Sequence, residues 1–93
     1  MEPFTLLKLK MRYHIAIDSA YEMDDNGKTV RLTEQDVSKL KSWNACWKNF
    51  RNEIVTFNYS DEKLVVTVRP LGDGKDVDTV VVYDKNGDVL QNA

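Results

Sequence analysis

The chain is poor in the residues that disulfides, metal sites and nucleophilic catalysis need. Its 93 residues include a single cysteine, Cys46, and a single histidine, His14. One cysteine cannot form a disulfide within the chain, which suits a reducing compartment. A structural zinc site takes about four cysteine or histidine ligands, and a catalytic thiol needs an aligned base. We therefore expect no metal, no cofactor, no catalytic residues and no enzymatic activity.

Long hydrophobic runs are also absent. No apolar stretch approaches the ~20 residues that a membrane helix requires, and the start Met-Glu-Pro-Phe lacks the basic region and apolar core of a signal peptide. Hydrophobic residues make up 42% of the chain and charged residues 30%, as in globular chains. We expect one α+β domain over residues 1–93, located in the cytoplasm and without a membrane partner.

The segment 5–17 contains no acidic residue, and apolar and polar residues alternate along it. A period of two indicates a strand, because successive side chains of a strand point to opposite faces. The expected buried set is Leu7, Leu9, Met11, Tyr13, Ile15 and Ile17. The opposite face would present Lys8, Lys10, Arg12 and His14.

A hairpin is predicted next, because Asn26-Gly27 favours the positive φ angles of a tight turn. The short strand 29–32 would pair back on the segment around Tyr21 and Met23.

A long helix is predicted over residues 33–52, where no glycine or proline occurs. Thr33 can cap its first turn, and acidic or amide side chains follow directly. At about 100° per residue, four apolar side chains fall in one stripe, which is typical of an amphipathic helix. These are Leu40, Trp43, Trp47 and Phe50, and we expect them in the core rather than in a ligand-stacking platform.

Further strands are predicted over 54–59, 63–69, 78–84 and 89–91, with turns at Ser60-Asp61-Glu62 and Asn86-Gly87. The resulting order is β-β-α-β-β-β. It predicts a two-layer α+β sandwich, in which one amphipathic helix crosses a mostly antiparallel sheet of about five strands. The inward set on the middle strands is Val55, Phe57, Tyr59, Leu64, Val66 and Val68. Because residues 80–82 are all valine, the buried face of the 79–83 run stays open.

The outward face of this expected sheet is half apolar and half basic. It would combine Lys8, Lys10, Arg12 and His14 with Val65, Thr67, Arg69 and Tyr83. Contiguous exposed apolar area often marks an interface. We therefore expect a protein-binding module that acts as an inhibitor or adaptor through a sheet face or edge. In its small size and its lack of catalytic groups the chain is similar to compact inhibitors and adaptors that mobile elements and viruses encode.

Two other partners stay open. A second copy of the chain is the simplest protein partner, since two-fold pairs are the commonest oligomers. Nucleic acid is the alternative from another class, because cations ~6.6 Å apart along a strand can track phosphates. The net charge of −2 and the lack of aromatic residues on that strand face favour the protein partner.

Overall fold

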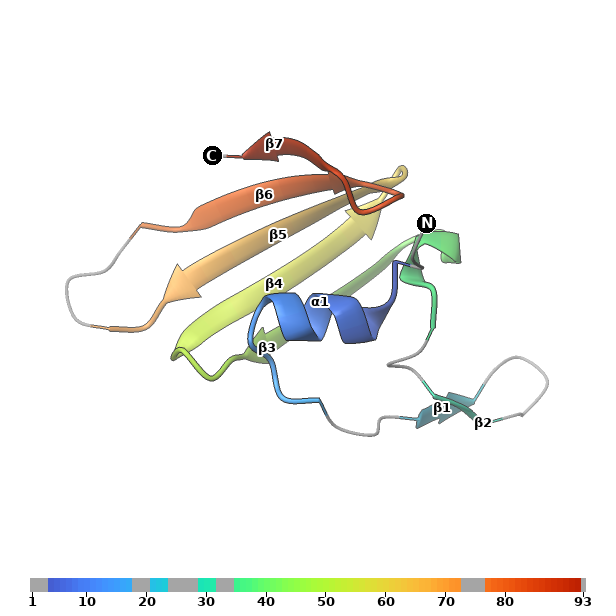
Figure 1. Cartoon of the computed structure of the whole chain (residues 1–93), viewed down its shortest axis with the longest axis horizontal. Helices are drawn as coiled ribbons and strands as arrows, with labels where there is room; N and C mark the ends of the chain where they lie inside the picture. Colours follow the sequence, from blue (N-terminus) through green and yellow to red (C-terminus); the bar gives the residue numbers. More distant parts are fainter. Residues whose placement is uncertain (1–3, 18–20, 24–28, 32–34, 73–76, 93) are drawn as a thin grey trace.

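An antiparallel sheet and a short helix form the body of the computed structural model (Figure 1). The structure describes residues 4–17, 21–23, 29–31, 35–72 and 77–92. The sheet strands, in spatial order, are β3 (Trp43–Lys48), β4 (Glu53–Ser60), β5 (Lys63–Pro70), β6 (Thr79–Asp84) and β7 (Val89–Asn92). The coarse prediction of an α+β chain with a five-stranded antiparallel sheet and one helix is confirmed.

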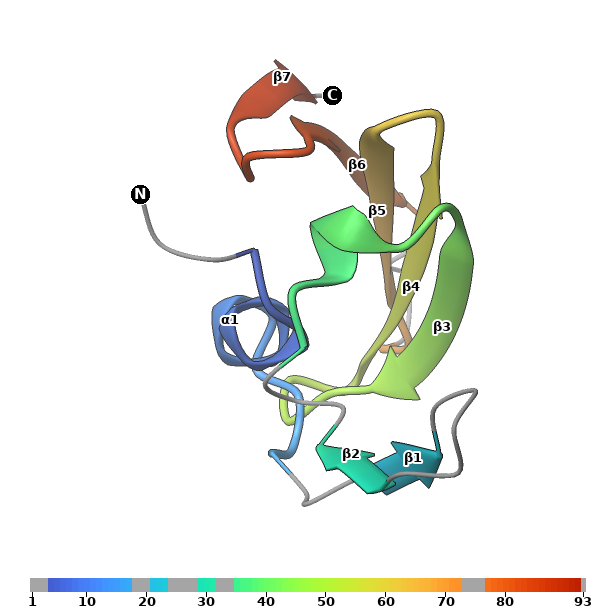
Figure 2. The ribbon, with the colours of Figure 1, turned by 90° about the vertical axis from the view of Figure 1, so that its right-hand side faces the viewer.

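The helical elements lie on one face of this sheet. They are α1 (Leu6–Arg12) and the 3₁₀ turn η2 (Val37–Lys39). In the side view of Figure 2 both stand on the same side of β3, β4 and β5. A separate hairpin joins β1 (Tyr21–Met23) to β2 (Thr29–Arg31), as predicted. The predicted Asn26-Gly27 turn between them lies outside the described residues.

The predicted strand over 5–17 is wrong, because its centre is the helix α1. The Thr5 hydroxyl caps this helix by accepting a hydrogen bond from the Lys8 N–H at 3.2 Å. The buried residues are Leu6, Leu9 and Lys10, a spacing of three and four that a helix places on one face. Leucine alternating with lysine is compatible with the period of a strand and with that of a helix. The burial of Leu6, Leu9 and Lys10 together is the pattern of a helix.

The predicted helix over 33–52 is also wrong. Residues 37–39 form only the turn η2, which Asp36 caps by accepting from the Ser38 N–H at 3.1 Å. β3 follows, with Trp43, Ala45 and Trp47 on its inner side. Residues four apart share a face in a helix and in a strand, so the two tryptophans do not separate the two states. Ala45 between them completes the strand pattern.

The four later strands agree with the prediction. Asp61 and Glu62 both have positive φ, 51° and 63°, as a two-residue hairpin turn requires. At the next turn, Gly87 has a φ of 85° and lies against the Phe4 ring. The order of helix and strands along the chain differs from the predicted one, because α1 precedes every described strand.

The core lies between α1, η2 and the inner face of the sheet. The six inward residues predicted on the middle strands all face it, together with Phe4, Leu6, Leu9, Ile15 and Val37. On β6 the inward residues are Val81 and Tyr83, which answers the open question about this strand. Three residues predicted for the core are exposed instead: Met11 (60%), Ile17 (54%) and Phe50 (79%).

Candidate protein-binding surfaces

The eight predicted contact residues do not share one surface. Lys10 is 3% exposed, and its Nζ lies 4.8 Å from the centre of the Trp47 ring. Lys8 and Arg12 are exposed on α1, and His14 is exposed just beyond it with a φ of 60°. The expected basic strand face is therefore absent, since its four residues are on or next to a helix on the covered side of the sheet.

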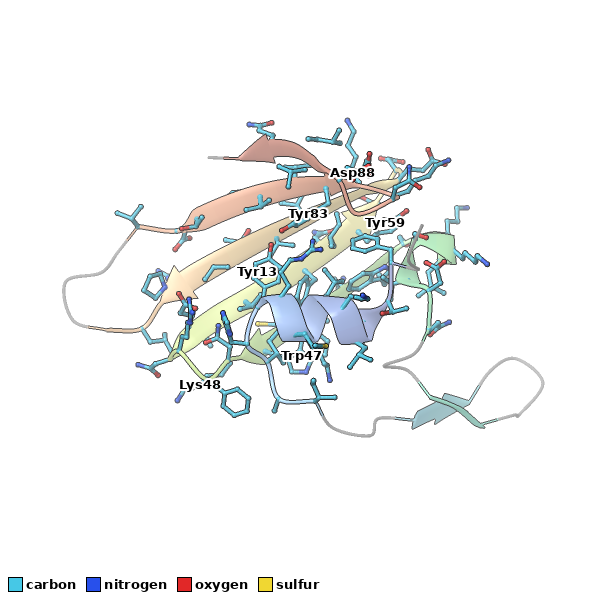
Figure 3. All side chains as sticks on the ribbon, viewed as in Figure 1. Tyr13, Trp47, Lys48, Tyr59, Tyr83 and Asp88 are labelled. Carbon is cyan, nitrogen blue, oxygen red and sulfur yellow. The ribbon has the colours of Figure 1, made fainter. Side chains whose placement is uncertain are left out.

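Tyr83 was predicted to face outward and is buried. Figure 3 shows Tyr13 reaching from the end of α1 toward Tyr83 on β6, and the two hydroxyls share a hydrogen bond. The guanidinium of Arg12 lies 5.2 Å from the centre of the Tyr83 ring. Burial raises the pKa of Tyr13, and the hydrogen bond to Tyr83 raises it further. The Tyr13 phenol is therefore neutral at physiological pH, and its hydrogen bond with Tyr83 holds α1 against the sheet.

Val65, Thr67 and Arg69 do lie together, on the face that α1 leaves uncovered. The register places Thr67 between Thr56 and Val80, and Val65 between Asn58 and Val82. We name the outer sheet face by its members Ile54, Thr56, Val65, Thr67, Arg69, Val80 and Val82. Within the described ranges no element packs on it (Figure 2). Its apolar centre is thus open to a partner.

The edge strand β3 borders a second surface feature. A cavity of about 250 Å³ opens between this strand and the helical layer. Its lining is mainly apolar and comprises Leu6, Gln35, Val37, Leu40, Trp43, Asn44, Ala45 and Trp47. The indole N–H of Trp43 donates to the Val37 carbonyl at 3.1 Å, so η2 is tied to the strand. The small side chain of Ala45 leaves space between the two indoles.

The turn between β3 and β4 is rigidly built around Asn49, which is 7% exposed. Its Nδ2 donates to the Tyr13 carbonyl at 2.9 Å and to Glu53 Oε1 at 2.8 Å. Its Oδ1 accepts from the N–H groups of Arg51 and Glu53, each at 3.0 Å. The next residue, Phe50, donates its N–H to the His14 carbonyl at 2.8 Å and points its ring into solvent. Sequence reasoning placed Phe50 in the core because it read this turn as helix.

Metal-binding and catalytic groups do not come together in the part of the chain that the structure describes. No group there of three or more His, Cys, Asp or Glu side chains could hold a metal ion. Cys46 is exposed and accepts a weak hydrogen bond from Thr56 Oγ1 at 3.7 Å on the outer side of the sheet. His14 follows α1 on the other side. The two residues that a thiol mechanism would need are thus on opposite faces.

No helix among the described residues is long and apolar enough to cross a membrane.

No protein-family model matches the chain. Comparisons with curated proteins and with solved structures found no similar protein either.

Proposed function

We propose that the chain is a non-enzymatic protein-binding module, which acts in the cytoplasm as an inhibitor or adaptor of a partner protein. The outer sheet face is the proposed contact surface. One observation supports this more than any other: within the described part of the chain the sheet is covered on one face only, and the other face has valines at its centre. Val65 and Val82 are cross-strand neighbours there, and Val65 is 36% exposed. A partner with a flat, apolar-centred surface would remove these side chains from water.

The alternative function, nucleic-acid binding, has less support than a protein partner. That alternative depended on a row of cations along a strand, whereas α1 is a helix and Lys10 is buried beneath Trp47. A second copy of the chain remains one candidate for the partner at the outer sheet face.

The test compares capture of a partner by matched variants. In the double variant Val65→Glu/Val82→Lys, opposite charges stand across one β5–β6 pair, so the sheet keeps a favourable contact while its apolar centre is lost. The control is Val77→Lys, at a valine that is 80% exposed and outside the outer sheet face. Each tagged protein is incubated with native cytosol, with and without nuclease, and the mass of the free protein is measured in solution.

A partner that survives nuclease, binds the control and is lost with the double variant supports the proposal. A dimer mass that only the double variant reduces to a monomer identifies the partner as a second copy. If the partner binds the double variant as well as the original protein, the outer sheet face is the wrong surface. If material is captured only in untreated cytosol, the ligand is a nucleic acid and the proposal fails.

A further inference from the structure

β3 is a sheet edge that lacks two of the usual protections against pairing with another strand, a proline and a β-bulge. Its six residues contain no proline and no register shift, and no other described strand pairs with its free side. The opposite edge, β7, has four residues, and its pairing with β6 shifts register between Val82 and Tyr83. Short, bulged edges resist strand addition, whereas regular ones permit it. Of these two edges, β3 is therefore the one suited to accept a further strand.

The backbone groups that β3 offers can be identified from the ladders on either side of β4. The Asn49 N–H donates to the Glu53 carbonyl at 2.9 Å, one step beyond the β3–β4 register. The Leu71 N–H donates to the Asn52 carbonyl at 3.1 Å, one step beyond the β4–β5 register. Since bonded pairs alternate along an antiparallel ladder, Trp43, Ala45 and Trp47 direct their backbone groups toward β4. The N–H and C=O groups of Asn44, Cys46 and Lys48 then face the free edge.

The cavity beside β3 defines which side chains an added strand would bring. A strand paired with β3 would lie about 4.8 Å from it, and alternate side chains would point into the helical layer. The side chain opposite Ala45 would enter the cavity of about 250 Å³ between Trp43, Trp47 and the side chains of Leu6 and Val37. A bulky aliphatic residue suits this position.

The charged side chains near one end of β3 favour an acidic residue at the adjacent end of an added strand. Lys48 is exposed at the end of the strand, and Arg51 is exposed in the turn that follows. The nearby carboxylate of Glu53 accepts a hydrogen bond from Asn49. At the other end, Lys41 lines a surface groove together with Asp61 and Glu62, so acidic side chains already stand there. An acidic residue is therefore best placed opposite Lys48.

We propose that β3 binds an extended peptide strand by antiparallel strand addition, with a bulky aliphatic side chain opposite Ala45 and an acidic residue opposite Lys48. This mode of recognition combines main-chain hydrogen bonds, which provide affinity, with a side-chain pocket, which provides specificity. The peptide-binding edge does not depend on the outer sheet face and extends the proposed function to a second surface.

A synthetic peptide, acetyl-Glu-Val-Thr-Leu-Thr-Val-Glu-amide, serves as the probe. With its leucine opposite Ala45, its first glutamate stands opposite Lys48, and its two threonines stand opposite Cys46 and Asn44. The threonine N–H groups then point at β3, whereas the leucine N–H points away. N-methylation of both threonines removes two of the three bonding donors, the third being the N–H of the first glutamate, and N-methylation of the leucine is the matched control.

Amide hydrogen exchange and titration provide the readouts. With peptide at ten times its Kd, the amides of Asn44, Cys46 and Lys48 should exchange about elevenfold more slowly, the factor that mass action gives. The amides of Ala45 and Trp47, already bonded to β4, should change little. The leucine-methylated peptide should bind within about threefold of the parent peptide, and the threonine-methylated peptide at least tenfold more weakly. No slowing of exchange at millimolar peptide, or equal binding of the threonine-methylated peptide, would overturn the proposal.

Protein variants separate this surface from the first one. Cys46→Pro removes an N–H that faces the free edge and should abolish peptide binding, while Cys46→Ser keeps the donor and should retain it. Ala45→Leu fills the cavity from within and should weaken the peptide at least tenfold. The outer-face variant Val65→Glu/Val82→Lys should bind the peptide as the original protein does. Loss of peptide binding in that variant, if it remains folded, would assign the peptide to the outer sheet face and refute the β3 site.

Discussion

Replacing Asn49 by alanine should cost the fold more than any exposed substitution, although the residue is in a turn. Four hydrogen bonds end on its side-chain amide, and they join the turn to Glu53 and to the residue that follows α1. A buried hydrogen bond contributes about 1 kcal/mol net, which gives about 4 kcal/mol for the four. The N–H groups of Arg51 and Glu53 can regain water at the exposed turn, so we expect a loss of about 2–3 kcal/mol.

Urea denaturation followed by tryptophan fluorescence measures this loss. For a chain of this size, 2–3 kcal/mol lowers the midpoint by roughly 2 M at an unchanged slope. Asn58→Ala is the control, because Asn58 is exposed on β4, and it should change stability by less than about 0.5 kcal/mol. Asn49→Asp keeps an acceptor for the two N–H groups, loses the two donated bonds and sets a carboxylate against Glu53. Its stability should lie below that of the original protein at neutral pH. A loss below about 1 kcal/mol for Asn49→Ala would refute the role given to this amide.

Two further predictions concern α1 and the last hairpin. Because the pKa of Tyr13 is raised above its ordinary value of 10.0, the folded state holds this proton more tightly than the unfolded state. The stability due to this difference is complete below about pH 10 and falls as pH rises further; Tyr13→Phe should flatten that fall in pH-dependent thermal melts and cost about 1 kcal/mol at pH 7. An unchanged slope above pH 10 would contradict the burial of this phenol. Gly87→Ala should cost about 1–2 kcal/mol, because Gly87 has a φ of 85° and the new Cβ would lie 3.3 Å from the Phe4 ring. Equal thermal midpoints of this variant and the original protein would show that the hairpin adapts to a side chain there.

The sequence pattern predicted the strands β4 and β5 well, because large apolar residues recur at every second position of each strand. It could not assign Trp43 and Trp47, since a spacing of four fits helix and strand alike. The small apolar residue Ala45, midway between the two tryptophans, was the local sign of a strand. Lys10 was assigned to solvent by its charge, but its long aliphatic stem lets it lie in the core with its ammonium group against Trp47.

These misassignments also explain which parts of the candidate site were found. Val65, Thr67 and Arg69 were placed on the outer face correctly, because the strand that holds them was assigned correctly. The free edge and the cavity were missed, because both depend on β3 being a strand. A free strand edge and a cavity form where no other segment packs. The hydrophobic pattern of one segment does not show which other segments will pack against it.

The order of the sheet has a consequence for the route by which the chain folds. Every sheet strand from β3 to β7 pairs with its neighbour in sequence, so each ladder closes through a short loop. By contrast, the link between Tyr13 and Tyr83 joins residues that are 70 positions apart. Because closing long loops costs more chain entropy, we expect the meander to be structured in the folding transition state and α1 to dock after it. Substitutions at Leu9 should then speed unfolding and leave the folding rate almost unchanged, whereas substitutions at Val66 should slow folding. The opposite pattern in stopped-flow kinetics would make α1 part of the folding nucleus.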